Sequence, residues 1–301
     1  MAKLKPIITL DQFYTKPGTA KHCYEKLHQV AQELDIDLSS YIFIEPSAGC
    51  GCFSQLLPKN RRILIDLEPK AIKGIDNTGI IQADYLKWFP SDLTKKYIVI
   101  GNPPFGVRGK LALDFINKSY PFADMVAFIL PQLFNSDGKG VAGKRVKGYQ
   151  LAYNEHLPSD SFMSPDGTDI AINTVFQIWT KINTDKITIP PKKTCESFIK
   201  VYSLSDGGNP ANTRNKKMIG KCDVYLPSTT FSGMRAYKSF YELPHERGYG
   251  VVIKNHKRDI GKLLRNHDWK KTAFLSTNSA LNLRTSLING VIIEEGYFDK
   301  P

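Results

Sequence analysis

The chain contains no long hydrophobic stretch. None of its apolar runs approaches the roughly 20 residues that a membrane-spanning helix requires, and Met1–Leu10 lacks the apolar centre of a secretory signal. Hydrophobic residues still make up 42% of the 301 residues and aromatic residues 11%, which is typical of folded chains. We therefore expect a soluble intracellular protein with no membrane partner, located in the cytoplasm or, in a eukaryote, in the nucleus. The chain is long enough for two domains.

Cysteine is also scarce, which argues against disulfide-rich and zinc-binding folds. The five cysteines are an odd number, and the close pair Cys50 and Cys52 lies in a glycine loop without the spacing of a Cys-x-x-Cys motif. His245, His256 and His267 also lack the spacing of metal ligands. We expect reduced cysteines and no bound metal.

Acidic residues are outnumbered, 29 against 41 basic ones, for a net charge of +12. Residues 1–182 carry 21 basic and 18 acidic residues, whereas residues 183–301 carry 20 and 11. Any single lysine cluster could be an ordinary solvated surface, but an excess concentrated in the last third favours contact with a polyanion.

A buried strand followed by a rigid loop is the most unusual local pattern. Three β-branched residues, Ile98–Ile100, predict a buried strand, and Asn102–Phe105 follows after one glycine. Pro103 and Pro104 have no backbone N–H, so the loop offers mainly acceptors, and Phe105 adds an aromatic face. The segment suits a planar ligand that carries an amino group, although a simple turn uses the same residue types.

A glycine loop precedes this segment. Tyr41–Ile44 predicts a short buried strand, and Gly49 and Gly51 form a turn that we expect to open a helix over Phe53–Leu57. Glu45 at the strand end would repel a phosphate, so the loop suits a cationic cofactor better than a dinucleotide.

Acidic residues end the next two predicted strands. Asp66 closes Arg62–Ile65, the position at which Rossmann-like sites bind ribose hydroxyls, with Glu68 as the competing candidate. Asp84 follows Ile80–Ala83 and could cap a helix that begins at residue 85.

Five segments of the chain form an ordered set of motifs: Phe13–Pro17, Phe43–Phe53, Ile63–Pro69, Ala83–Leu86 and Asn102–Phe105. S-adenosylmethionine-dependent N6-adenine DNA methyltransferases of the γ class have such motifs in the same order. The first 180 or so residues therefore resemble this family. The resemblance implies an α/β fold, with a Rossmann-like class I methyltransferase domain over residues 1–182. Its sheet should have seven mostly parallel strands and an antiparallel edge hairpin, and a smaller mixed domain should follow over residues 183–301.

The resemblance also assigns roles to residues. The catalytic loop is Asn102, Pro103, Pro104 and Phe105, with Phe105 and Phe162 stacking on the substrate base and Phe176 expected in the core. S-adenosyl-L-methionine would be bound by Tyr14, Thr15, Pro17, Glu45, Ser47, Gly49, Gly51, Asp66, Asp84 and Asn102.

Further periodic and apolar stretches complete the expected elements. We expect a helix over residues 20–34 and another over 111–120, a strand over 125–130, a strand pair over 151–157 and 171–179, and a domain linker over 183–193. Beyond the linker lie apolar runs over 198–204, 223–226, 249–253 and 291–293, with one helix over 259–264.

Basic clusters predict the contacts with nucleic acid. The residues expected to contact phosphates lie in a glycine-rich loop and in two clusters of the C-terminal domain. They are Lys144, Arg145 and Lys147 in the loop, and Arg214, Lys216, Lys217, Lys254, Lys257 and Arg258 in the clusters. Asparagines beside them could contact base edges.

The predicted activity is methyl transfer to N6 of an adenine flipped out of double-stranded DNA by a monomeric enzyme, as a restriction-modification or orphan methylase. An RNA or mRNA-cap adenosine methyltransferase would use the same loop. Two further alternatives are a protein-glutamine methyltransferase and a non-catalytic nucleic-acid-binding subunit.

Overall fold

The computed structural model describes residues 13–49, 51–69, 79–135, 142–164, 167–187, 193–231, 233–275 and 280–300. The chain divides into two compact units, Met1–Thr188 and Ile189–Pro301. The boundary that we placed between residues 182 and 183 lies close to this division. Residues 188–192 of the predicted linker fall outside the described residues. No helix in the described ranges is long and apolar enough to cross a membrane.

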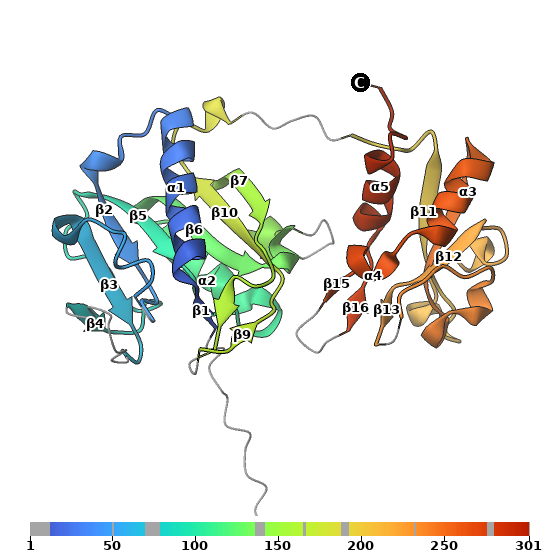
Figure 1. The fold of residues 1–301 in the computed structure, drawn as a ribbon, viewed down its shortest axis with the longest axis horizontal. Coiled ribbons are helices and arrows are strands. Elements are labelled where there is room, and N and C mark those ends of the chain that lie inside the picture. Colours follow the sequence, from blue (N-terminus) through green and yellow to red (C-terminus); the bar gives the residue numbers. More distant parts are fainter. Residues whose placement is uncertain are drawn as a thin grey trace, which may run out of the picture. The chain divides into compact units, whose positions relative to one another are not determined.

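A seven-stranded sheet organises the first unit (Figure 1). In spatial order its strands are β4 (Ile80–Gln82), β3 (Arg62–Asp66), β2 (Tyr41–Glu45), β5 (Lys96–Gly101), β6 (Ala123–Pro131), β10 (Thr174–Thr180) and β7 (Gln150–His156). The pairs among β2 to β6 are parallel, whereas β10 is antiparallel to both of its neighbours. The mostly parallel sheet with an antiparallel edge hairpin confirms the predicted Rossmann-like class I methyltransferase fold.

The strand order reverses beside β2. The chain proceeds outward from β2 through β3 to β4, and then returns to place β5 on the other side of β2. Connections leaving β2 and β5 therefore diverge, which opens a crevice beyond the carboxyl ends of these strands. Glu45 ends β2 and Asn102 follows β5, so both lie at this crevice.

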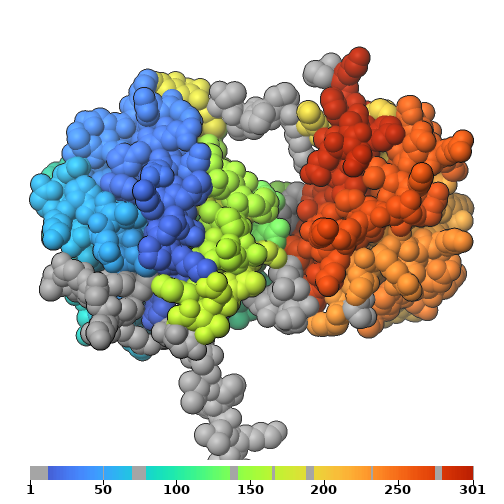
Figure 2. All heavy atoms as spheres, viewed as in Figure 1, coloured from blue at the N-terminus to red at the C-terminus, as the bar shows by residue number. Residues whose placement is uncertain are grey.

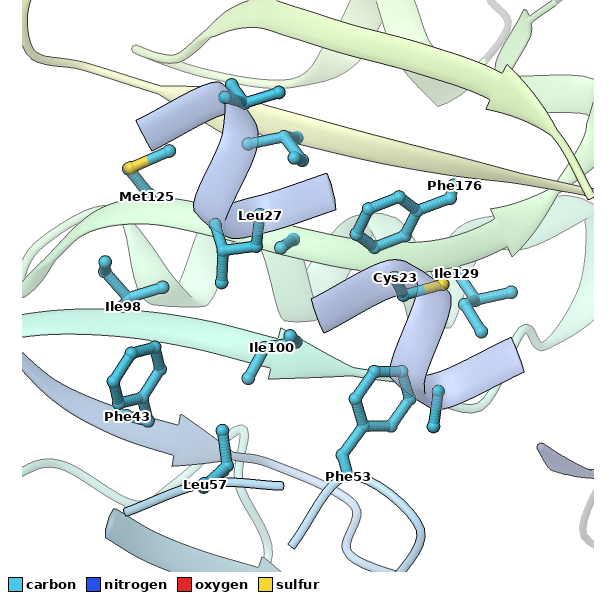
Figure 3. Packing of buried hydrophobic residues seen from close by; sticks show 14 of the residues in the cluster. Cys23, Leu27, Phe43, Phe53, Leu57, Ile98, Ile100, Met125, Ile129 and Phe176 are labelled. Atoms are coloured by element: carbon cyan, nitrogen blue, oxygen red, sulfur yellow. The ribbon is translucent and has the colours of Figure 1, made fainter. Parts of the chain in front are cut away.

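One helix covers each face of the sheet. Alternate residues of a strand point to opposite faces, and the core is divided accordingly into two clusters. In one, Cys23 and Leu27 of α1 (Pro17–Glu33) pack with Phe43, Ile98 and Ile100 (Figure 3). In the other, α2 (Lys110–Ser119) packs its buried side chains on the alternate strand positions, which are Ile44, Val99, Val126, Phe128 and Leu130.

A small second sheet fixes the N-terminal segment. In this sheet β1 (Tyr14–Thr15) pairs with β8 (Phe162–Met163), which pairs with β9 (Asp169–Ile170). Lys16 N–H donates to the Ser161 carbonyl at 3.0 Å. Figure 2 shows the blue atoms of α1 beside yellow-green atoms of the region that contains β7. His22 Nε2 of α1 and Glu155 Oε1 of β7 are 2.7 Å apart. The segment before α1 is thus held by residues far along the chain.

The helix predicted over Phe53–Leu57 is wrong. This stretch forms consecutive turns, in which Leu56 N–H donates to the Phe53 carbonyl at 2.9 Å. No helix begins at residue 85 either; Asp84 instead caps a turn, accepting from Leu86 N–H at 3.0 Å. The helix predicted over 111–120 and the strand over 125–130 are confirmed as α2 and β6.

The second unit packs helices on one face of an antiparallel sheet, whose strands in spatial order are β11 (Ile199–Ser205), β14 (Arg247–Ile253) and β12 (Val224–Pro227). A separate small sheet contains β13 (Thr229–Thr230), β16 (Leu281–Asn282) and β15 (Phe274–Leu275). The helices are α3 (Lys257–Asn266), α4 (Trp269–Thr272) and α5 (Thr285–Glu294).

Two features of this unit extend the sequence analysis. The apolar run over residues 291–293 belongs to α5, whose Ile288, Val291 and Ile292 are buried at helical spacing. Asp299 fastens the final segment by accepting from Ser197 N–H at 3.2 Å and Thr194 Oγ1 at 2.6 Å. Hydrogen bonds from the Ser197 and Thr194 side chains lower the pKa of Asp299 to about 2.

Candidate active site

A cavity of about 230 Å³ opens at the carboxyl ends of β2, β3 and β5. Most of the residues assigned by resemblance to the cofactor and the catalytic loop meet there. The lining includes Tyr14, Thr15, Glu45, Ser47, Gly49, Asp66, Asp84, Asn102, Pro103, Pro104 and Phe105.

Asn102 lies where β5 gives way to the loop. Its Nδ2 donates to the Phe13 carbonyl at 3.1 Å, and because that carbonyl can only accept, the bond fixes the orientation of the amide. The other amide atom, Oδ1, is buried and has no hydrogen-bond partner in the part of the chain that the structure describes. A buried acceptor left unpaired costs about 1–3 kcal/mol. A ligand that donates a hydrogen bond to Oδ1 would remove this free-energy cost.

The two prolines and Phe105 extend this wall. Neither Pro103 nor Pro104 carries a backbone N–H, so these two residues offer a ligand acceptors and no donor. Phe105 is 8% exposed and lines the cavity, and its carbonyl accepts from Ala112 N–H of α2 at 3.3 Å. The aromatic ring is thus anchored through the backbone to a packed helix.

The glycine loop is fastened to both neighbouring strands. Ser47 Oγ donates to the Asn102 carbonyl at 2.9 Å, which ties the loop to the Asn102–Phe105 segment. Gly49 has a φ of +48°, and a Cβ there would lie 3.6 Å from the Tyr14 ring. Tyr14, on β1, therefore lies against the loop at ordinary contact distance, and the positive φ favours glycine at this position.

Carboxylates dominate the charge of the cavity wall. Glu45, Asp66, Glu68 and Asp84 all line it, and no lysine, arginine or histidine does so among the described residues. Glu45 is 2% exposed and accepts a hydrogen bond from Ser54 Oγ. This lining favours a ligand with positive charge and disfavours one with phosphates.

Asp66 braces the loop as well as facing the cavity. Its Oδ2 accepts from Gly49 N–H and its Oδ1 from Glu68 N–H, each at 2.8 Å. Each carboxylate oxygen keeps a further acceptor position. Glu68, the competing candidate for the ribose, also lines the cavity but is exposed.

Apolar lining residues went unassigned in the sequence analysis. Leu67 is 54% exposed although it follows β3 directly, and Leu86 and Ala83 flank Asp84. Asp84 itself is held by Leu86 N–H and by Lys87, 3.3 Å from its Oδ2. In the sequence, a leucine directly after a predicted strand and beside an acidic residue is the signal that could have identified this apolar surface.

Three residues with predicted roles lie elsewhere. Pro17 begins α1 and Gly51 is buried in the loop, but neither lines the cavity. Phe162 is fully buried, pairs with Thr15 across β1 and β8, and belongs to the same core cluster as Phe176. A base in the cavity would not reach the Phe162 ring without rearrangement of the core.

Several predicted phosphate contacts have partners inside the protein. Lys216 pairs with Asp206 at 3.0 Å, Lys257 pairs with Asp223 at 2.8 Å, and Lys254 donates to the Glu196 carbonyl at 2.6 Å. These three residues are exposed, as are the other candidates, and α3 adds two exposed residues that the sequence did not single out. The other candidates are Lys144, Arg145, Lys147, Arg214, Lys217 and Arg258, and those added by α3 are Lys262 and Arg265.

Comparisons with known proteins give similarity to solved structures alone. No protein-family model matches the chain, and no curated protein matches it. A Pyrococcus horikoshii protein proposed to be an RNA methyltransferase is 18% identical with a TM-score of 0.44, over 59% of this chain and 91% of its own. A Thermoplasma acidophilum protein is 16% identical with a TM-score of 0.37, over 59% and 91%. The 23S rRNA methyltransferase ErmE is 13% identical with a TM-score of 0.33, over 51% and 67%. The fold assignment stands on the strand order, and these similarities say nothing of activity.

Proposed function

We propose that the protein is an S-adenosylmethionine-dependent methyltransferase that modifies N6 of adenine in double-stranded DNA. The observation that carries the proposal is the oriented, unpaired Asn102 Oδ1 at the cavity. It lies in an Asn-Pro-Pro-Phe segment at the end of a central strand, as in the γ-class enzymes that the sequence resembles.

The cavity fits the proposed cofactor. A molecule with an ammonium and a sulfonium group suits a wall with four carboxylates and no cationic side chain among the described residues. Glu45 and the glycine loop would hold the methionine part, Asp66 the ribose, and Asp84 the adenine amino group against Leu67 and Leu86. When bound, S-adenosylmethionine supplies an electrophilic methyl group.

The protein's part in the reaction is to orient a poor nucleophile. The lone pair of an adenine amino nitrogen is delocalised into the ring, so the amino group must be made more pyramidal before it can attack. Asn102 Oδ1 and the Pro103 carbonyl would each accept one amino hydrogen, which favours this geometry and directs the lone pair toward the methyl group. One of the two hydrogens then leaves as a proton once the nitrogen has gained its methyl group.

The substrate base must leave the duplex to enter a cavity of this kind. Phe105, held at the wall, would stack on the flipped adenine, a contact that contributes roughly 1–3 kcal/mol. Exposed cations on the second unit, including Arg258 and Arg265, would contact phosphates of the flanking DNA.

Methyl transfer to different nucleic acids tests the proposal. Tritiated S-adenosylmethionine is incubated with unmethylated duplex DNA, the same DNA after heat denaturation, and total RNA, and the products are digested to nucleosides. We expect label in N6-methyldeoxyadenosine from duplex DNA. Label confined to RNA would replace the proposed substrate and keep the chemistry, whereas label in another nucleoside would refute the role of Asn102.

A further inference from the structure

A strained turn directly follows the catalytic loop. Three of the four residues from 106 to 109 have left-handed backbone angles: Gly106 with φ +64°, Arg108 with φ +53° and Gly109 with φ +68°. An arginine rarely adopts this conformation, which a side chain with Cβ disfavours. Such strain persists only where the surrounding structure enforces it, and it is common at functional sites.

The surroundings do hold this turn in place. Gly109 N–H donates to the Gly106 carbonyl at 3.2 Å. A Cβ on Gly106 would lie 2.7 Å from Leu111 Cβ, and one on Gly109 would lie 3.0 Å from the Phe134 ring. The two glycines are thus packed against α2 and its neighbours, and the turn between them is fixed from both ends.

Val107 lies at the top of the turn. It is 84% exposed, more than Leu93 at 65% or any other large hydrophobic residue identified as exposed in the described ranges. Single exposed apolar residues are common on protein surfaces. This one differs in being β-branched, and therefore stiff, on a turn whose backbone is strained and packed.

The turn connects two residues of the cavity wall. Phe105 and Leu111 both line the cavity, and residues 106 to 110 join them without lining it. Val107 and Arg108 therefore lie within three residues of Phe105 along the chain, beside the cavity that would receive the base.

We propose that Val107 enters the DNA duplex as a wedge where the target adenine has left, while Arg108 contacts a neighbouring phosphate. This inference rests on the proposed function. Flipping a base leaves a gap and unstacks its neighbours, and an apolar side chain that fills the gap compensates part of that cost. Arg108 keeps its guanidinium exposed beside the wedge, where it could neutralise a backbone charge.

Variants of Val107 test the wedge. Methylation of unmethylated duplex genomic DNA is measured for the full-length wild type and for Val107→Ser, Val107→Ile and Leu93→Ser. We expect the rate to fall about tenfold or more in V107S, because the polar, smaller side chain fills less apolar space. It should stay within about twofold of wild type in V107I, which keeps the wedge, and in L93S, which alters another exposed apolar residue outside the turn.

Arg108→Gly separates function from folding. Glycine tolerates the left-handed backbone, so R108G should melt at a higher temperature than wild type. The same variant should methylate duplex DNA more slowly, with a weaker dependence on salt, because a phosphate contact is lost. If Arg108 had only a structural role, its replacement by glycine would change stability and activity in the same direction.

The outcomes distinguish this inference from the proposed function. If wild type methylates duplex DNA and V107S does so at the same rate, the wedge is refuted and the methyltransferase proposal stands. A V107I rate as low as that of V107S would also refute it. If wild type methylates no DNA, the proposed function fails and the wedge fails with it.

Discussion

Replacement of Asn102 by alanine should separate activity from stability. The change deletes the bond from Nδ2 to the Phe13 carbonyl, 3.1 Å long, which costs about 1 kcal/mol. It also deletes the buried Oδ1, whose unpaired state costs about 1–3 kcal/mol. The two effects oppose each other, so we expect the free energy of unfolding to stay within about 1 kcal/mol of wild type.

Activity should respond very differently. Loss of a preorganised hydrogen-bonding group at the reacting atom typically lowers kcat about 100- to 1,000-fold. Cofactor affinity should change little, because the carboxylates and the glycine loop remain. Asn102→Asp gives a useful contrast: a carboxylate oxygen would face the Phe13 carbonyl oxygen, so this variant should lose stability as well as activity.

Three measurements on each variant decide the matter. Urea unfolding followed by circular dichroism gives stability, titration calorimetry gives affinity for S-adenosylmethionine, and transfer of labelled methyl groups gives kcat. An N102A enzyme that keeps more than about a tenth of wild-type kcat would refute the acceptor role. An N102A protein several kcal/mol less stable than wild type would instead show that Oδ1 has a structural partner.

Three further changes test other parts of the structure. Asp66→Asn puts an amide NH2 against a backbone N–H that now donates to the carboxylate. Calorimetry should show S-adenosylmethionine binding weakened about tenfold or more. A larger loss of affinity in Glu68→Gln would assign the ribose to Glu68. Gly106→Ala should lower the free energy of unfolding in urea by about 1–2 kcal/mol, because φ is +64°. Its control, Gly18→Ala in the first turn of α1, has open space for a Cβ and should be neutral or stabilising by up to about 1 kcal/mol; equal effects would contradict the strain argument. Asp299 has a lowered pKa of about 2, so its stabilising effect is complete above its ordinary pKa of 3.8 and is lost as the pH falls toward 2. The stability difference between wild type and Asp299→Asn should therefore shrink over that range in acid titrations followed by tryptophan fluorescence, and a constant difference would exclude this carboxylate as its source.

The ends of the strands could be predicted from the sequence because they depend on the local pattern of residues. Ile98–Ile100 forms part of β5, and Asp66 and Asn102 come at the ends of β3 and β5, which lie on either side of β2 and open on one cavity. Residue type and position along the strand are enough to predict such a meeting.

Other features depend on partners distant in sequence. The pairing of Thr15 with Phe162 joins two-residue strands, which leave no periodic signal and move Phe162 into the core. Lys216 and Lys257, which were predicted to contact phosphates, also pair with Asp206 and Asp223, and no local pattern reveals these partners. The helix expected over Phe53–Leu57 failed because that short apolar stretch fits a turn equally well.

The pairing of β1 with β8 links the cavity to a strand that does not line it. Tyr14 rests against Gly49 while its own strand pairs with Phe162 and Met163. A ligand that binds only while Tyr14 rests against the loop also stabilises this strand pairing. Amide hydrogens of β8 should then exchange with solvent more slowly when the cavity is filled, which makes β8 a remote reporter of occupancy.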